Sequence, residues 1–235
     1  MANWFGVTSA INIQNGIFTS DDRFDQTVKT IESIRDKCPD SKVVLLEGGP
    51  YGLSDVQHAV MSKICDKVIV LKSDPMIKWM HVRMNIQQLK SPSELYLMEQ
   101  FLHLVPMNED DRVFKISGRY KLSDKFDINT HTSDKAVFGP KFKSCMYFDR
   151  ESGKQYEPLT EWQYRTRLYS FPGTMIPEMK DKFNEMTSFF WELYKTSFSD
   201  VEHVMYKFMD HDKVQEVPIV GLTGIFAERD QLVDE

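Results

Sequence analysis

Residues 23–49, RFDQTVKTIESIRDKCPDSKVVLLEGG, carry the pattern that decides the fold. Apolar residues in the first part recur at helical spacing: Phe24, Val28, Ile31 and Ile34. Ser20 and Asp21 are natural caps for this helix. Residues 43–49 form a continuous apolar run closed by two glycines, which is typical of a strand covered on both faces. With a plausible first strand in residues 4–11, the stretch predicts a β-α-β unit.

The same alternation continues along the chain. We expect helices in residues 53–64, 76–88 and 92–105, and strands in residues 67–71 and 112–117. The first of these helices has an apolar stripe made of Val56, Ala59, Val60 and Ile64. Ser91 is the expected cap of the third, with Pro92 in its first turn and Glu94 three residues after the cap. Strands that alternate with helices imply a mostly parallel sheet in a three-layer α/β/α, Rossmann-like fold.

From about Lys135 the pattern changes. Residues 135–154 and 162–173 alternate aromatic and polar residues with turn signals, which suits antiparallel strands or an ordered cover over an active site. Residues 179–196 and 199–209 are expected helices, and an apolar run follows at 218–226.

Composition limits the class of protein. A chain of 235 residues with 41% hydrophobic residues is long enough for one substantial domain. The net charge of -6 argues against a general nucleic-acid binder, because phosphate backbones require an excess of Lys and Arg. Cys38, Cys65 and Cys145 form neither a disulfide framework nor a zinc pattern, which favours a reducing, cytoplasmic location. The sequence has no transmembrane segment, so we expect a soluble protein and leave peripheral membrane association open.

Ligands of open parallel sheets collect at the carboxyl ends of the strands. Glu47, followed by two glycines, ends the second strand and could accept a hydrogen bond from a ribose hydroxyl or a base. An ordinary strand exit is the alternative. Lys90, Ser93 and Glu94 stand near the start of the helix before the fourth strand, where a ligand role competes with a capping box and a solvated lysine.

Residues 113–122, VFKISGRYKL, end an apolar strand in positive charge. Lys115 and Arg119 bracket Gly118, and an arginine offers a planar fork of donors that suits a diphosphate. The glycine permits backbone geometry that other residues avoid. Alternatively these charges are solvated or paired with a neighbour such as Asp111. A phosphate-binding site is therefore one of two interpretations of this stretch.

Residues 23–49, 89–105 and 113–127, in this order, resemble small GT-A-type glycosyltransferases that viruses, phages and bacterial surface-polysaccharide clusters encode. Weaker likeness extends to residues 199–209 and 217–233. The resemblance implies one nucleotide-sugar-binding domain over residues 1–235. Its donor half is 1–125, and 126–235 is a helical and antiparallel acceptor half. It also implies a hexosyl- or pentosyltransferase that uses a UDP- or GDP-sugar and a glycan, glycoprotein or glycolipid acceptor.

The chain departs from this family at the metal site. Most GT-A enzymes hold a divalent metal, Mn or Mg, with an Asp-x-Asp pair at the strand end where this chain has Lys115, Ser117 and Arg119. Either positive side chains replace the metal, or its ligands come from elsewhere. The candidate acids are Asp21, Asp22, Asp110, Asp111, Asp124, Asp210 and Asp212, with His211, and each is also explained as a cap or turn residue.

If the chain transfers a sugar, the leaving nucleoside diphosphate gains negative charge that fixed cations stabilise, and a carboxylate activates the acceptor hydroxyl when configuration inverts. We assign Lys115 and Arg119 to the diphosphate and Glu47 to the nucleoside. Asp200 or Glu202, at the start of a late helix, is the candidate base. Helix starts also favour acids through the macrodipole, which is the structural alternative.

Two competing bases and two other functions remain open. Glu161 and Asp149 compete with Asp200 and Glu202 as the base. Four aromatic residues could stack on an acceptor sugar or belong to the core: Trp162, Tyr164, Tyr169 and Phe171. A sugar nucleotidyltransferase would have a similar sheet, but residues 8–16, TSAINIQNG, lack its glycine-rich loop with a basic residue. A non-catalytic nucleotide- or glycan-binding protein would explain the missing Asp-x-Asp pair.

Overall fold

The computed structural model describes residues 1–13, 17–84, 86–144, 147–148, 153, 155–193, 199–226 and 231–235. Within them the main sheet has seven strands in the order β12-β6-β11-β4-β1-β2-β3. These are β1 (Asn3–Ser9), β2 (Lys42–Glu47), β3 (Lys67–Val70), β4 (Arg112–Ser117), β6 (Ala136–Phe138), β11 (Leu168–Pro172) and β12 (Val214–Glu216). Strands β3, β2, β1 and β4 run parallel, whereas β11 is antiparallel to β4 and β6. The predicted mixed, mostly parallel sheet is confirmed.

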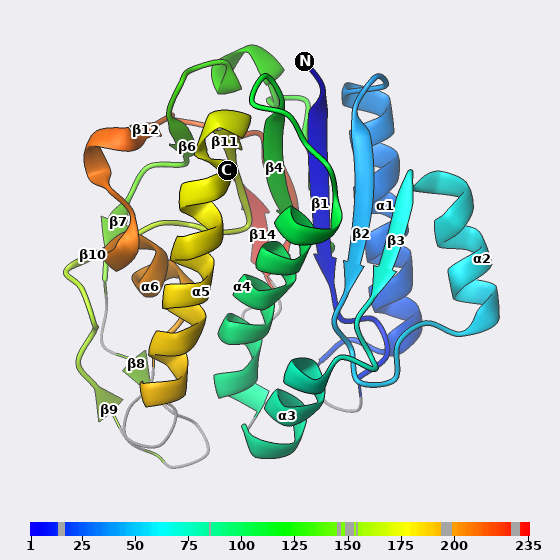
Figure 1. Cartoon of the computed structure of the whole chain (residues 1–235), viewed down its shortest axis with the longest axis horizontal. Helices are drawn as coiled ribbons and strands as arrows, with labels where there is room; N and C mark the ends of the chain where they lie inside the picture. Colours follow the sequence, from blue (N-terminus) through cyan, green and yellow to red (C-terminus); the bar gives the residue numbers. More distant parts are fainter. Residues whose placement is uncertain are drawn as a thin grey trace.

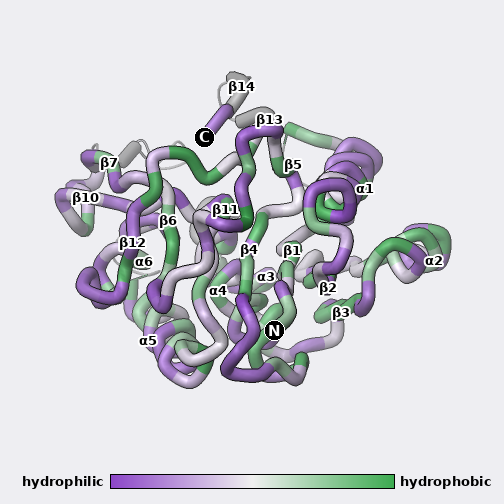
Figure 2. The backbone as a smooth tube through the Cα atoms, turned by 90° about the horizontal axis from the view of Figure 1, so that it is seen from above, coloured by the Kyte–Doolittle hydropathy of each residue, from purple (hydrophilic) through white to green (hydrophobic). Residues whose placement is uncertain are grey.

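Helices cover both faces of this sheet (Figures 1 and 2). They are α1 (Ser20–Lys37), α2 (Asp55–Ile64), α3 (Pro75–Arg83), α4 (Ile86–Leu104), α5 (Ile176–Leu193) and α6 (Val201–Phe208). Side chains of a strand alternate between the two faces. In β2, Val44 and Leu46 therefore pack with α4, α5 and α6, while Val43 and Leu45 pack with α1.

The antiparallel pairing expected in the second half is present. Besides β11, short strands pair as β7 (Phe142–Lys143) with β10 (Trp162–Gln163), and β8 (Tyr147–Phe148) with β9 (Gln155–Tyr156). The late apolar run forms β13 (Leu222–Phe226), which lies between β5 (Tyr120–Leu122) and β14 (Gln231–Asp234) on the α1 side. Three 3-10 turns complete the described elements: η1 (Ile128–His131), η2 (Gly173–Met175) and η3 (His211–Lys213). Residues 194–196, the end of the helix expected at 179–196, lie outside the described residues.

Two expected helix starts are wrong. Helix α1 is capped by Thr19, whose hydroxyl accepts from the amide of Asp22 while the Asp22 carboxylate accepts from the amide of Thr19. Helix α4 begins at Ile86, so Pro92 lies inside it and Ser91 does not cap it. The hydroxyl of Ser91 instead accepts from the amide of Val201, at the start of α6, at 3.0 Å. Capping chemistry was present at Ser91, but it serves another helix.

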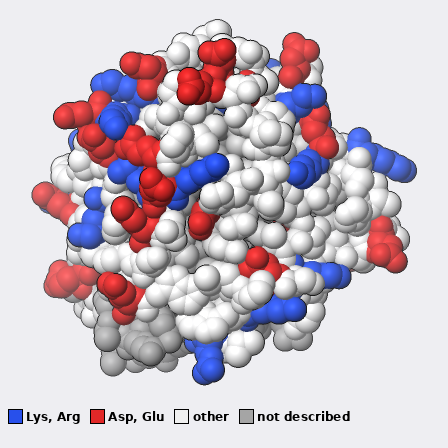
Figure 3. Space-filling view, viewed as in Figure 1, with Lys and Arg blue, Asp and Glu red and all other residues white. Residues whose placement is uncertain are grey.

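The expected apolar stripe of α2 is also wrong. Met61 is the buried residue of this helix, whereas Val56 is 74% exposed. Helix α2 packs at the edge of the sheet, against β3 and α1, so only a narrow strip of it is covered. On the face seen in Figure 3, acidic and basic side chains intermingle. In the described part of the chain, no helix combines the length and the apolar character that a membrane span requires.

Candidate active site

The carboxyl ends of β1 and β4 meet the first half of α1. The amide of Gly118 donates to the carbonyl of Thr8 at 2.8 Å, and the Thr27 hydroxyl donates to the carbonyl of Gly118 at 3.2 Å. A Cβ atom on Gly118 would lie 3.1 Å from Thr27 Oγ1 and 3.2 Å from the Thr8 carbonyl. Its φ is not positive. Gly118 is therefore needed for close approach between α1 and β4 rather than for an unusual backbone conformation.

Lys115 points from β4 into the layer of α4 and α6. Its side chain has no exposed surface, and Nζ donates to Glu94 Oε1 at 2.6 Å, Ser117 Oγ at 2.7 Å and the Thr166 carbonyl at 2.6 Å. Burial lowers the pKa of Lys115, and Glu94 opposes that shift. The three donors of the ammonium group are all in use. Direct contact between Lys115 and a diphosphate stays a prediction.

Glu202 adjoins this buried cation. Its Oε1 accepts from the Thr166 hydroxyl at 3.3 Å, so Thr166 connects Glu202 to Lys115. Desolvation, followed by the charges of Asp200 and Glu94, raises the pKa of the half-buried Glu202 carboxyl to about 8. A partly accessible carboxyl with a shifted pKa is the kind of group that acid–base chemistry uses.

Asp200, the other candidate base, is the N-cap of α6. Its Oδ1 accepts from the amide of His203 at 3.0 Å and lies 2.5 Å from His203 Nδ1. These contacts fix the start of the helix that carries Glu202. The structure thus brings Asp200 and Glu202 into the same group of charges as Lys115, while the choice of base between them stays a prediction.

Glu47 lies inside the protein, with no exposed surface. Its carboxylate accepts from Ser9 Oγ at 2.5 Å, from the amide of Ile11 at 3.1 Å and from the amide of Gly49 at 2.8 Å. A Cβ on Gly49 would lie 2.5 Å from Glu47 Oε1, so the glycine makes room for this carboxylate. Burial raises the pKa of Glu47. In this structure Glu47 holds the segment after β1, and its contact with a nucleoside stays a prediction.

Arg119 is half-buried, with Cζ 5.9 Å from the centre of the Tyr120 ring. A second arginine, Arg23 of α1, lies in its electrostatic range. The Arg23 side chain donates from Nε to the Phe18 carbonyl at 3.3 Å and from Nη1 to the Ala10 carbonyl at 3.4 Å. Sequence reasoning missed Arg23. No signal in the sequence distinguishes it from a solvated charge near the start of an amphipathic helix.

Lys90 is exposed on α4, and its carbonyl accepts from Ser93 Oγ at 3.0 Å. The expected grouping with Glu94 is not kept, because the Glu94 carboxylate points to Lys115. A ligand role for Lys90 stays a prediction.

The strand end does not fit a divalent metal. Ser117, Gly118 and Arg119 offer no carboxylate there, and a guanidinium repels a cation. Among the candidate acids, Asp22 accepts from the amide of Thr19, the N-cap of α1, and Asp210 caps η3. Asp111 accepts from the amides of Ala2 and Asn108 and from Trp4 Nε1, and Asp124 pairs with Lys37. In the described residues, no group of three or more His, Cys, Asp or Glu side chains could hold a metal ion.

Three of the four aromatic candidates belong to the core. Tyr164, Tyr169 and Phe171 are at most 2% exposed, and the first two stack on Phe138 with ring centres 4.7 and 5.0 Å apart. Trp162 is half-buried and Glu161 is exposed. Asp149 and Cys145 lie outside the described residues.

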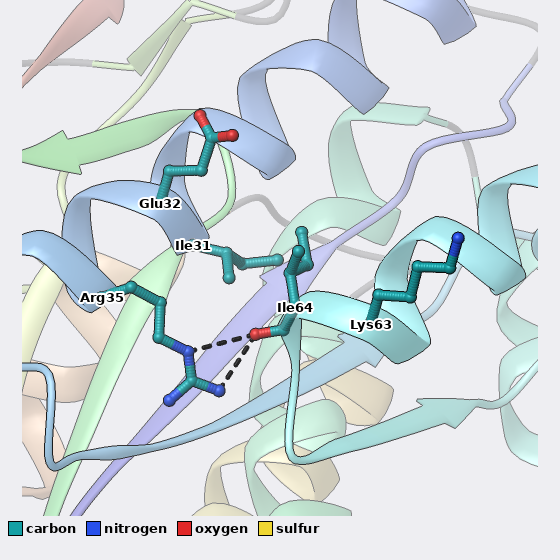
Figure 4. A pocket seen from close by; sticks show the side chains of 5 residues that line it. All are labelled: Ile31, Glu32, Arg35, Lys63 and Ile64. Carbon is teal, nitrogen blue, oxygen red and sulfur yellow. Dashed lines mark hydrogen bonds between the residues drawn. The ribbon is translucent and has the colours of Figure 1, made fainter.

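A hollow of about 460 Å³ lies elsewhere, between α1 and α2 (Figure 4). It is lined by Ile31, Glu32, Arg35, Lys63 and Ile64. Arg35 donates from Nε and Nη2 to the Ile64 carbonyl at 3.1 and 3.0 Å, which ties the two helices together. None of the predicted site residues lines this hollow, so we place the candidate site at the carboxyl ends of β1 and β4.

The chain has the mixed α/β fold of GT-A-type glycosyltransferases. It is similar to the galactosyltransferase LgtC, solved with donor and acceptor sugar analogues: 10% identity and a TM-score of 0.54 over 92% of this chain and 73% of that one. Core-mannan synthase A from Aspergillus fumigatus, in its Mn/GDP form, gives 8% identity and a TM-score of 0.54 over 92% and 72%. The bifunctional glycosyltransferase WbbM gives 10% and 0.52 over 92% and 38%.

At these identities the similarity concerns the fold alone. The sequence matches no protein-family model and no curated protein.

Proposed function

We propose that this protein transfers a sugar from a UDP- or GDP-sugar to a hydroxyl group of a glycan, glycoprotein or glycolipid. The GT-A-type fold supports this proposal. The observation that carries it is that basic side chains and an acidic side chain lie close together at the C-terminal end of β4. There Lys115 lies in electrostatic range of both Arg119 and the half-buried Glu202. Residues 1–125 would form the donor half and residues 126–235 the acceptor half.

The two kinds of charge suit the two halves of the reaction. Negative charge grows on the nucleoside diphosphate as the glycosyl bond breaks, and the Arg119 guanidinium can stabilise it through paired N–H donors. Lys115, buried in β4, would add positive electrostatic potential near Arg119. Glu202 is our preferred base for the acceptor hydroxyl in an inverting reaction. A carboxyl whose pKa is raised to about 8 is a stronger proton acceptor, once ionised, than an ordinary one.

The test is release of free nucleoside diphosphate. The protein is incubated with a panel of UDP- and GDP-sugars, with Mn²⁺, with Mg²⁺ and with EDTA. We expect slow donor hydrolysis without acceptor and faster release when a suitable glycan is added. If nucleotides raise the melting temperature but no donor releases nucleoside diphosphate, the protein is a non-catalytic binder. Release of pyrophosphate from a nucleoside triphosphate and a sugar phosphate would instead identify a sugar nucleotidyltransferase.

Arg119→Ala is the matched loss-of-function variant. We expect it to abolish donor turnover while the melting temperature stays close to that of the wild type, because Arg119 is half-buried and outside the apolar core. Lys121→Ala removes one positive charge two residues away, from the exposed face of β5, and should retain turnover. Wild-type turnover in Arg119→Ala would remove the diphosphate role.

A further inference from the structure

Two guanidinium groups come from different elements to the same edge of the sheet. Thr27 of α1 contacts the Gly118 carbonyl, which fixes α1 against the end of β4. Arg23 lies one helical turn before Thr27 on the same face of α1, and Arg119 directly follows Gly118. The hydrogen bond from Arg23 to the Ala10 carbonyl also places it beside the end of β1. Both arginines therefore lie where β1 and β4 end.

Neither arginine forms an ion pair within the described part of the chain. Other arginines of this protein are differently placed: Arg35 pairs with Asp66 at 2.8 Å, and Arg112 donates to Ser170 and to two carbonyls. Arg23 uses two of its five N–H donors on the carbonyls of Phe18 and Ala10. Its guanidinium is thus held in position but not neutralised.

The local charges favour an anion. Partial burial, followed by the charge of Arg119, lowers the pKa of Arg23, as expected for like charges that share a site. The carboxyl whose charge acts on Arg23 is that of Glu47. It is buried and already accepts hydrogen bonds from Ser9, Ile11 and Gly49. An anion between the arginines would relieve their repulsion. A divalent cation there would increase it.

We propose that Arg23 and Arg119 together bind the diphosphate of the nucleotide donor without a divalent metal. The proposal rests on the glycosyl-transfer function above, to which it adds a second diphosphate ligand and metal independence. Each guanidinium offers a planar fork that matches a pair of phosphate oxygens. Because the forks come from a helix and a strand end that are packed together, the site is preorganised before the donor arrives.

Calorimetric titration in EDTA tests this site directly. The probes are UDP, GDP and inorganic pyrophosphate, and the variants are Arg23→Gln and Arg119→Gln. Hydrogen bonds between charged groups of this kind correspond to roughly ten-fold or more in affinity, so each variant should bind at least about ten-fold more weakly. Lys29→Gln on α1 and Lys121→Gln on β5 remove the same charge from exposed positions and should bind as the wild type does.

The outcomes separate this site from the proposed function. Loss of EDTA-resistant binding in both arginine variants, with both controls intact, supports the site even if no nucleotide sugar is turned over. Wild-type binding that requires Mn²⁺, no binding of any probe, or donor turnover that is unchanged in both variants would overturn it. If Arg23→Gln does not fold, Arg23→Lys takes its place. It keeps the charge but loses the fork, and should bind more weakly than the wild type, whereas equal binding would refute the role of Arg23.

Discussion

The ammonium of Lys115 lies 2.6 Å from a carboxylate oxygen of Glu94, in the interior between β4 and α4. Ser117 and the Thr166 carbonyl complete its set of acceptors. Lys115 is therefore first of all a buried counter-ion for the carboxyls around it. Arg119, which stands four residues later and has no such partner in the described residues, is the better placed of the two cations for an incoming anion.

Lys115→Met should lower the free energy of unfolding by about 3 kcal/mol, because it leaves the carboxylates near Lys115 without their cation. Urea unfolding measures this loss. Lys121→Met, on the exposed face of β5, is the control and should stay close to the wild type. An equal loss in both variants would contradict a buried ion pair at Lys115.

Glu202 should make stability depend on pH. Its pKa in the folded protein is about 8, above its ordinary value of 4.5. Between these two pH values the folded protein keeps a proton that the unfolded chain releases, so this residue's contribution to stability falls as pH rises through the window. The melting temperature of Glu202→Gln relative to that of the wild type should therefore rise from pH 5 to pH 8.5. A constant difference between the two melting temperatures would refute the raised pKa of Glu202. The control is Glu32→Gln, at an exposed position on α1.

Glu47→Gln should loosen the segment after β1. The amide keeps the shape of the side chain but turns an NH₂ group toward donors that the carboxylate now accepts from: Ser9, Ile11 and Gly49. We expect a loss of about 2 kcal/mol in the free energy of unfolding, typical of an unsatisfied buried polar group. Hydrogen exchange should speed up at the amides of Ile11 and Gly49. Unchanged exchange at both would mean that Glu47 does not hold this segment.

Gly118→Ala should push α1 away from β4. The new methyl group would lie 3.1 Å from Thr27 Oγ1 and 3.2 Å from the Thr8 carbonyl, so we expect a loss of about 1 kcal/mol or more. Gly139→Ala is a matched control because its nearest contact is an ordinary 3.5 Å to Val220. Adding Thr27→Ala to Gly118→Ala should recover part of the loss in a double-mutant cycle. Strictly additive losses would show that the methyl group and Thr27 do not collide.

The strands were predictable because burial on both faces leaves a continuous apolar run. Residues 112–117 were expected as a strand and form β4 over the same residues. Cap residues were less predictable. Ser91 has the chemistry of a cap, but which helix it serves depends on the position of α6, 110 residues away. Similarly, the alternation in β4 fixes the face that Lys115 occupies, but its pairing with Glu94 requires the packing of α4 on that face.

The candidate site was predictable in location more than in detail. The rule that ligands bind at the carboxyl ends of parallel strands selected Glu47 and Arg119. It could not find Arg23, because a single arginine in the first turns of an amphipathic helix looks like any solvated charge. Nor could it tell that Glu47 is buried, since that follows from donors in two separate segments, Ser9 and Ile11 at the end of β1 and Gly49 after β2.

The hydrogen bond from the Val201 amide to Ser91 gives the eight-residue helix α6 an anchor on α4. A helix this short has little stability alone, so its register comes from that anchor and from Asp200. The place of Glu202 thus depends on a hydroxyl group of another helix, far away in the chain. Among relatives of this protein, a hydroxyl residue should therefore persist at the position of Ser91.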